Sequence, residues 1–266
     1  EIRKLARQAH GACTVSYGDT MVLATVVTST KPRDGIDYFP LMVDYEEKFY
    51  AAGKIKGSRF IKREGRPSDE AVLSGRLIDR AIRPLFPEEM KNDVQVILSV
   101  LSQDDKNDAD IVALNAAAAV LYVSDVPWDG PIAGVRVGRV DGELVLNPTY
   151  EQREKSDLDL VVAGTKENVL MIEAGANEIT EDDVFAAIQF AQKHIGDVTA
   201  LLEDAKQGIG KEKMALEDLV VKSSSEESED SAEDKDALSI ADEFIRKNID
   251  EHLFTGPMKS KGERKE

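Results

Sequence analysis

Runs of alternating apolar residues joined by short glycine-containing turns constrain the fold of this chain more than any other feature. The clearest case is residues 134–148, where apolar and polar residues alternate on both sides of Asp141-Gly142. An Asp-Gly pair in this setting is a strong signal for a two-residue hairpin turn. The same reasoning predicts strand pairs from residues 13–17 and 20–28 across Gly18-Asp19, and from residues 158–163 and 168–173 across Gly164-Thr165.

The remaining elements are further strands and a few helices. Residues 94–101 are continuously apolar and rich in β-branched side chains, which is typical of a buried strand, and residues 39–45 predict another strand. Helices are predicted at residues 68–83, at the alanine-rich residues 110–123, and from Thr180 onward. Consecutive strands interrupted by a few helices indicate an α+β layered domain and not a regular βαβ alternation.

Composition places the chain among globular proteins. Of its 266 residues 42% are apolar, which is enough for a core, and the longest apolar runs are far below the roughly 18 residues of a membrane span. The single cysteine, Cys13, excludes an internal disulfide, fits a reducing cytoplasm and is expected to fill space in a strand. His10, His194 and His252 lie far apart, so we expect no metal site in this chain and no membrane segment.

The net charge of −17 argues against binding to nucleic acid, which depends on lysine and arginine side chains, but the charge is unevenly distributed. Residues 223–236 carry seven acids and one lysine. Residues 54–83 carry nine lysines and arginines against four acids. A cationic segment therefore lies within an otherwise acidic chain.

The compact domain is predicted to span residues 1–210. Residues 211–266 are predicted to form a helical linker-domain segment, because helical spacing of apolar residues returns at 237–252. Within this segment, residues 223–236 are too acidic and serine-rich to pack, so we expect a disordered insertion. The chain begins without an initiator methionine and ends in a charged stretch, and we expect it to be part of a longer protein.

Glycines and cations alternate in GKIKGSRFIKREGRP, which begins at Gly53 and includes Arg66. Glycine gives the backbone freedom, the cations can follow phosphates, and Phe60 can stack a base. The alternative is an ordinary solvated loop in which Phe60 turns into the core.

The helix that Ser68 is predicted to cap carries Arg76, Arg80 and Arg83 at i, i+4 and i+7, which places three guanidinium groups along one face. Three aligned cations repel each other unless something anionic lies against them. The alternative is a plain surface helix in which Asp79 pairs with Arg83. The apolar residues Val72, Leu73, Leu77 and Ile78 favour arginines at the edge of a buried helix.

The string AAGKIKGSRFIKREGRPSDEAVLSGRLIDRAIRPLFP resembles the first ribonuclease PH-like domain of bacterial polynucleotide phosphorylases. FPLMVDYEEKFYAAGKI, NDADIVALNAAAAVL, GPIAGVRVG and SDLDLVVAGT resemble the same domain in the same order, so the resemblance covers nearly all of residues 1–210. It implies the ribonuclease PH-like fold, also described as ribosomal protein S5 domain 2-like: a mixed sheet with packed helices, followed here by an α-helical segment.

The resemblance also implies an RNA site and an assembly. Phe60, Ile61, Lys62 and Arg63 match the motif, usually two phenylalanines and two arginines, that grips single-stranded RNA at the neck of a homotrimeric ring. Ile61 and Lys62 depart from that motif, which puts part of the stacking in doubt. The helix with Arg76, Arg80 and Arg83 matches the family's arginine-bearing helix, which faces a phosphate-dependent active site in single-domain relatives.

By the same resemblance, the catalytic residues belong to a second ribonuclease PH-like domain outside this chain. That domain would bind Mg²⁺ and use inorganic phosphate as co-substrate in a phosphorolytic 3′ to 5′ exoribonuclease that degrades mRNA in the cytoplasm and releases nucleoside diphosphates. This chain would be the RNA-handling, non-catalytic half, with other RNA-degradation proteins as further partners. The alternatives are a stand-alone inactive ring subunit of an exosome-like assembly and an acidic scaffold with no RNA role. The acids at positions 104, 105, 108 and 110 are expected in a loop and a helix start.

Overall fold

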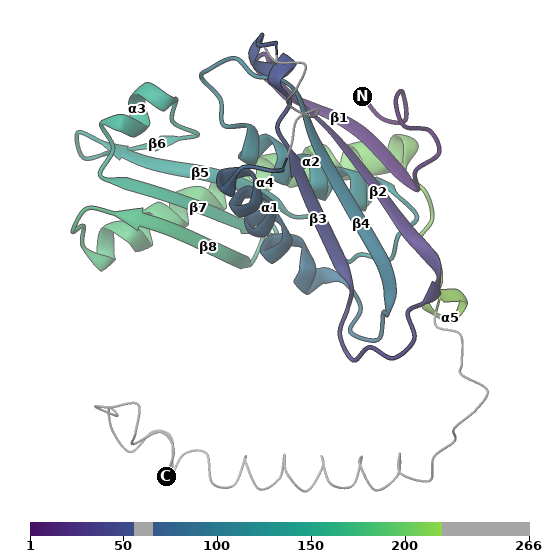
Figure 1. The fold of residues 1–266 in the computed structure, drawn as a ribbon. Coiled ribbons are helices and arrows are strands. Elements are labelled where there is room, and N and C mark those ends of the chain that lie inside the picture. The colour runs from purple at the N-terminus through teal and green to yellow at the C-terminus, as the bar shows by residue number, and fades with distance from the viewer. Residues whose placement is uncertain (56–65, 220–266) are drawn as a thin grey trace, which may run out of the picture. The chain divides into compact units, whose positions relative to one another are not determined.

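The computed structural model describes residues 1–55 and 66–219, which belong to a compact unit, Glu1–Val221. Two four-stranded sheets and the helices packed on them form this unit (Figure 1). The strands are β1 (Gly11–Tyr17), β2 (Thr20–Pro32), β3 (Leu41–Glu46), β4 (Asn92–Ser102), β5 (Ala133–Val140), β6 (Glu143–Leu146), β7 (Leu158–Gly164) and β8 (Val169–Ala176). The helices are α1 (Asp69–Ile82), α2 (Ala109–Val123), α3 (Tyr150–Glu154), α4 (Glu181–Ile209) and α5 (Leu216–Leu219), with the 3-10 turns η1 (Phe49–Ala52) and η2 (Arg83–Leu85).

The first sheet has the order β1-β2-β4-β3. Its strands pair antiparallel except for β3, which runs parallel to β4 and forms a free edge. The predicted turn between β1 and β2 is confirmed, with Gly18 at a φ of 58°. Cys13 is buried in β1 as predicted, where 3% of its surface is exposed.

The second sheet has the order β6-β5-β7-β8 and is antiparallel throughout. The predicted hairpin around Asp141-Gly142 joins β5 to β6, and both residues adopt positive φ angles of 52° and 83°. These angles are the ones that a two-residue hairpin turn requires. Strand β8 is the free edge of this sheet on the side toward α1 (Figure 1).

Helix α2 joins the two halves of the core. It packs on β1, β2 and β4 of the first sheet and on β5 of the second, and nearly all of its residues are buried. A side chain at Gly134 in β5 would lie only 2.6 Å from Leu114, so the close approach of α2 to the second sheet requires glycine there. Helix α4 covers the other face of the second sheet, and its N-cap is Thr180, as predicted. The predicted α+β architecture is thereby confirmed.

Residues 211–219 return to the first half of the unit. Lys213 donates hydrogen bonds to the carbonyls of Leu121 and Ser124 at the end of α2, and Leu219 is buried in the core. Burial lowers the pKa of the Lys213 amine to about 8. The predicted boundary at residue 210 stays a prediction, as does the helical segment 211–266 with its insertion at 223–236, most of which lies outside the described residues.

Within residues 1–55 and 66–219, no helix combines the length and the apolar character that crossing a membrane requires.

Candidate functional site

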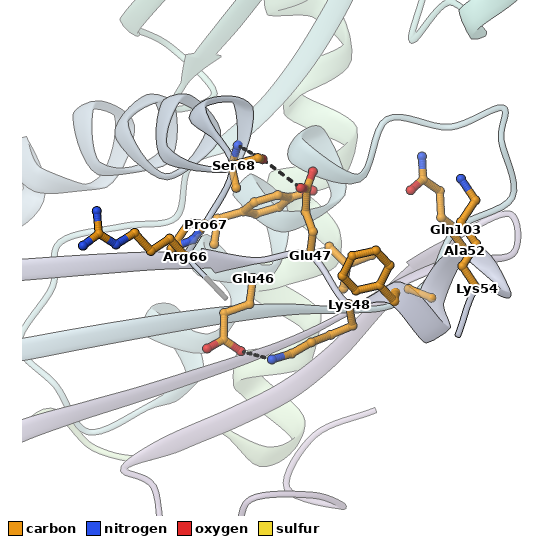
Figure 2. Close-up of a pocket in the computed structure, with 14 residues that line it drawn as sticks. Glu46, Glu47, Lys48, Ala52, Lys54, Arg66, Pro67, Ser68 and Gln103 are labelled. Atoms are coloured by element: carbon orange, nitrogen blue, oxygen red, sulfur yellow. Dashed lines mark hydrogen bonds and ion pairs between the residues drawn. The ribbon is translucent and has the colours of Figure 1, made fainter. Parts of the chain in front are cut away.

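The main candidate site is a cavity of about 540 Å³ at the two ends of residues 56–65. Figure 2 shows Lys54 and Gln103 on one side of this loop-end cavity and Arg66, Pro67 and Ser68 on the other. Lys54 and Arg66 are exposed, and their side chains have no hydrogen-bond or ion-pair partner among residues 1–55 and 66–219. The chain therefore enters and leaves the cationic segment through two cations that have no partner among the described residues.

Short elements hold the walls of the loop-end cavity. Ser68 caps α1 by accepting a hydrogen bond from the Ala71 N–H at 3.0 Å, as the sequence predicts, and its hydroxyl donates to Glu47 at 3.0 Å. Turn η1 follows β3 and ends at Gly53, whose φ of 65° favours glycine. The N–H of Gln103, just after β4, donates to the Ala51 carbonyl and fixes η1 to the first sheet.

The two carboxylates at the loop-end cavity are both engaged. Lys48 lies 3.1 Å from Glu46, and Ser99 donates a hydrogen bond to Glu46 at 2.9 Å. Burial raises the pKa of Glu46, but Lys48 and Ser99 together hold that pKa below its ordinary value. Since Glu46 is charged and paired while Lys54 and Arg66 have no described partner, a polyanion would meet available cations at this opening.

Four of the predicted RNA-binding residues, Phe60, Ile61, Lys62 and Arg63, lie outside the described residues, and their role stays a prediction. Arg66 is described and lines the loop-end cavity.

Two of the three arginines of α1 that were predicted to face RNA make ion pairs and hydrogen bonds within the chain. Arg83 pairs with Asp79 at 2.7 Å, as the alternative interpretation of the sequence predicted, and donates to the carbonyls of Phe39 and Leu41 beside the free edge of β3. Arg80 pairs with Glu173 at 2.7 Å and donates to the Ile172 carbonyl on the free edge of β8. The two arginines therefore connect α1 to an edge strand of each sheet.

Arg76 differs from its two neighbours on α1. It is exposed and has no side-chain partner in the described part of the chain. It lines a smaller cavity of about 310 Å³ that shares Pro67 and Ala71 with the loop-end cavity. A path with cations at Lys54, Arg66 and Arg76 thus runs from the ends of the segment along one face of α1.

The expectation that α1 is buried between its arginines is wrong for two residues. Leu77 and Ile78 are buried, but Val72 and Leu73 are 49% and 64% exposed. Leu77 and Ile78 face the core, whereas Val72 and Leu73 lie on the surface. An apolar side chain is not always buried, so the apolar character of Val72 and Leu73 did not show on which side they lie.

Replacing Arg83 with methionine is expected to lower the free energy of unfolding by about 1 to 2 kcal/mol, because two carbonyls and a carboxylate lose their donor. The matched control is Arg76 to methionine on the same helix, which should change stability by less than about 0.5 kcal/mol. Urea unfolding measures both. Equal losses in the two variants would show that Arg83 does not hold α1 to β3.

The opposite face of α1 borders an acidic groove. We define the acidic groove as two adjoining cavities of about 390 and 620 Å³, which contain Glu47, Glu70, Asp108, Asp110, Glu154, Asp159 and Glu173. Its floor is a network in which Arg136 bridges Asp108, Asp110 and Asp159, and Arg153 bridges Asp108 and Asp159. Arg136 is only 6% exposed.

This network shifts the ionisation of its members. Burial raises the pKa of Asp110 and outweighs the opposing effect of Arg136. Burial also raises the pKa of Asp159, but Arg136 and Arg153 bring it below the ordinary value. Arg136 Nε lies 2.7 Å from Asp108 Oδ2, an ion-pair distance without hydrogen-bond geometry. The arginines of the groove are thus neutralised by carboxylates and are not available to a phosphate.

The sequence places Asp104 in a loop and Asp108 and Asp110 at the start of a helix, and the structure agrees, with Asp108 as the N-cap of α2. The sequence did not show that these acids meet Arg136 and Arg153. The alternation of apolar and polar residues in 134–148 places Arg136 on the polar face of its strand and gave no signal of these partners.

The described residues hold no group of three or more histidine, cysteine, aspartate or glutamate side chains arranged to bind a metal ion. Asp108, Asp110 and Asp159 converge, but on the guanidinium of Arg136. The side chains described here therefore do not fit Mg²⁺.

Residues 1–127 match the family described as the 3′ exoribonuclease family, domain 1, and residues 130–194 match domain 2 of the same family. The first match contains the first sheet with α1 and α2, and the second contains the second sheet and the first half of α4. The compact unit therefore combines both halves described for the family.

Curated relatives include polyribonucleotide nucleotidyltransferases from Alkaliphilus oremlandii (54% identical), Heliobacterium modesticaldum (55%) and Halothermothrix orenii (56%). The matches cover 80 to 81% of this chain and 30% of each relative. The chain thus spans about a third of the length of the curated relatives it matches. The predicted resemblance to polynucleotide phosphorylases is confirmed.

Among solved structures, rice Rrp46 superposes with a TM-score of 0.64 at 17% identity, covering 78% of this chain and 92% of that one. At this identity the likeness concerns the fold alone.

Proposed function

Because the chain belongs to the 3′ exoribonuclease family, we propose that it is the RNA-handling half of a phosphorolytic 3′ to 5′ exoribonuclease. Its role is to hold single-stranded RNA while the bond is broken on another domain of the longer protein. One contrast carries this proposal: the cavities on one side of α1 contain cations without a partner among the described residues, alongside Asp44, Glu46, Glu47 and Asp79, whereas the arginines of the groove on the other side are all bound by carboxylates.

This contrast in charge favours RNA binding at the cations and disfavours binding of inorganic phosphate in the acidic groove. A single strand is held largely by lysine and arginine contacts to phosphates, and Lys54, Arg66 and Arg76 are placed to make them. Attack by inorganic phosphate instead needs a site that accepts a free anion. In the acidic groove a phosphate would face Asp110, Asp159 and Glu173, so the groove disfavours it.

The full reaction, in this proposal, is attack of inorganic phosphate on the 3′-terminal phosphodiester with release of a nucleoside diphosphate. Mg²⁺, held outside this chain, would stabilise charge on the reacting oxygens. The assembly would be a homotrimeric ring in the cytoplasm that works with other RNA-degradation proteins in mRNA turnover. The relatives named polyribonucleotide nucleotidyltransferase favour this role over that of a stand-alone inactive ring subunit.

The test is phosphorolysis by this chain alone. Incubated with poly(A), inorganic phosphate and Mg²⁺, the chain is expected to release no ADP, while it retards a labelled oligo(A) in a binding assay. Chromatography of the nucleotide fraction measures the product. Release of ADP would place an active site in this chain, and failure to bind oligo(A) at low salt would remove the RNA-handling role.

A further inference from the structure

The acidic groove holds more carboxylates than its arginines neutralise. Four of its seven acids are paired with arginines at the contacts described above. The other three are Glu47, Glu70 and Glu154. Glu70 and Glu154 are exposed and have no hydrogen-bond or ion-pair partner among residues 1–55 and 66–219, and in the same part of the chain Glu47 accepts from the Ser68 hydroxyl but meets no cation.

A buried tyrosine presents its polar group to the same groove. Tyr45 in β3 is only 6% exposed, yet its hydroxyl has no hydrogen-bond partner in the part of the chain that the structure describes. Tyr45 lines the larger cavity of the groove, and burial together with Asp110 and Glu47 raises the pKa of its hydroxyl, which places that hydroxyl near their carboxylates. Buried tyrosine hydroxyls ordinarily have a partner, so the unused one indicates that the groove receives a ligand.

The charge of the groove requires a cation, and the placement of its acids disfavours a metal ion. A metal ion needs several oxygen ligands that converge on one point. The described residues contain no such group of three acids. The three carboxylates without a cation come from different elements: Glu47 follows β3, Glu70 belongs to the first turn of α1, and Glu154 ends α3. A ligand with several separate positive charges can meet each of them.

The walls of the groove indicate what joins those charges. The smaller cavity is lined by the apolar side chains of Leu73, Leu77 and Val161, and Leu73 is 64% exposed. The two cavities share Glu70 and Ser74, so the apolar wall continues into the acidic end. Aliphatic chains that carry an ammonium group cover apolar surface while the charged group binds elsewhere.

We propose that the acidic groove binds an aliphatic polyamine, whose ammonium groups contact Glu47, Glu70, Glu154 and the Tyr45 hydroxyl while its methylene chain lies against Leu73. This site is separate from the proposed RNA-binding role and does not rest on it. Because the groove and the loop-end cavity share Glu47, a bound polyamine lowers the negative charge that RNA meets at that cavity.

The test is isothermal titration of the 266-residue chain with spermidine at low salt. A chain at −17 attracts any polycation, so the decisive variant keeps the charge. Replacing Tyr45 with phenylalanine removes only the hydroxyl and should weaken spermidine binding about tenfold, as for a hydrogen bond to a charged group. Its stability in urea should be unchanged, because the hydroxyl has no described partner to lose.

A second pair of variants tests the carboxylates. Glu70 to glutamine should weaken spermidine binding about threefold, as for a partly exposed ion pair. The control is Glu181 to glutamine, which removes an exposed acid from the first turn of α4 outside the groove and should leave the affinity unchanged. Mg²⁺ at the same ionic strength should not displace spermidine.

Each other result overturns the inference. Full affinity in the Tyr45 variant would show that its hydroxyl does not contact the polyamine, and a loss of stability in urea would mean that the hydroxyl is bonded within the fold. Equal losses for the Glu70 and Glu181 variants, or displacement by Mg²⁺, would show that spermidine responds only to the overall charge. Tighter binding of an oligolysine peptide with the same losses would make the occupant a protein segment.

Discussion

Replacing Arg136 with methionine is expected to lower the free energy of unfolding of this chain by about 3 to 5 kcal/mol at pH 7. Arg136 is only 6% exposed, and its guanidinium contacts three carboxylates, those of Asp108, Asp110 and Asp159. Methionine retains the apolar stem but leaves those carboxylates without their shared cation. Removing one partner of a buried ionic group costs more than the group contributes, because the remaining charges stay desolvated.

The pH dependence gives this prediction a sign. Without Arg136 the folded-state pKa of Asp110, already above its ordinary value, rises further, and that of Asp159, held below its ordinary value, rises as well. The folded variant then binds more protons than the folded unaltered chain, so it loses less stability than the unaltered chain does as the pH falls. The loss relative to the unaltered chain should therefore be smaller near pH 4.5 than at pH 7. Urea unfolding followed by circular dichroism at both pH values measures it.

The matched control is Arg33 to methionine. Arg33 pairs with Asp93 at 3.2 Å, but both side chains are more than half exposed, so the change should be within about 0.5 kcal/mol and nearly independent of pH. A loss at Arg136 no greater than that at Arg33 would contradict the view that the network holds the two halves together. A loss that grew toward low pH would contradict the assigned direction of the carboxylate pKa shifts.

The network also supports the proposal that inorganic phosphate is bound outside the acidic groove. Asp108 and Asp110 start α2, Arg136 belongs to β5, and Asp159 belongs to β7, so a single cluster ties the first half of the unit to the second sheet. The N-terminus of a helix ordinarily attracts anions. At the N-terminus of α2, Asp108 and Asp110 occupy the position of such an anion and are bound by Arg136. A free phosphate there would be repelled by the two carboxylates and would find Arg136 already paired.

Local signals predicted the fold well because each one acts over a few residues. The turn at Asp141-Gly142 requires positive φ angles, and Ser68 and Thr180 bond to amides three positions on. Such requirements are met within a single element. The sequence therefore predicts where the strands and helices lie to within a few residues.

Partners of charged side chains that lie far away in sequence could not be predicted in this way, although the Asp79–Arg83 pair, four residues apart, was. Helical spacing places Arg80 and Arg83 along one side of α1, but their acceptors on β8 and beside β3 are 92 and 44 residues away in sequence. The spacing of residues along a helix specifies which of them share a face, but it does not specify which other elements that face contacts. The resemblance makes both arginines candidates for RNA, and that role stays a prediction. The structure adds only that both have partners within the fold, whereas Arg76 has none among the described residues.

Reversing the charge of Lys54 and Arg66 together to glutamate is expected to weaken oligo(A) binding by about tenfold at low salt. Two phosphate contacts are lost, and two new carboxylates repel the strand. The slope of log affinity against log salt should also become shallower, by roughly 0.7 for each lost contact on a single strand. Fluorescence anisotropy across a salt series measures both quantities.

The control must change the net charge equally, because a chain at −17 already repels RNA at long range. Lys4 and Lys155 are suitable: both are exposed, and among the described residues they pair with neighbours in sequence, Glu1 and Glu151. Their reversal to glutamate should lower affinity slightly and leave the salt slope unchanged, since no contact is removed. If both double variants lose affinity equally with the same slope, RNA senses only the overall charge, and the loop-end cavity is not where the phosphates bind. A shallower slope for Lys54 and Arg66 alone assigns two phosphate contacts to the ends of the cationic segment.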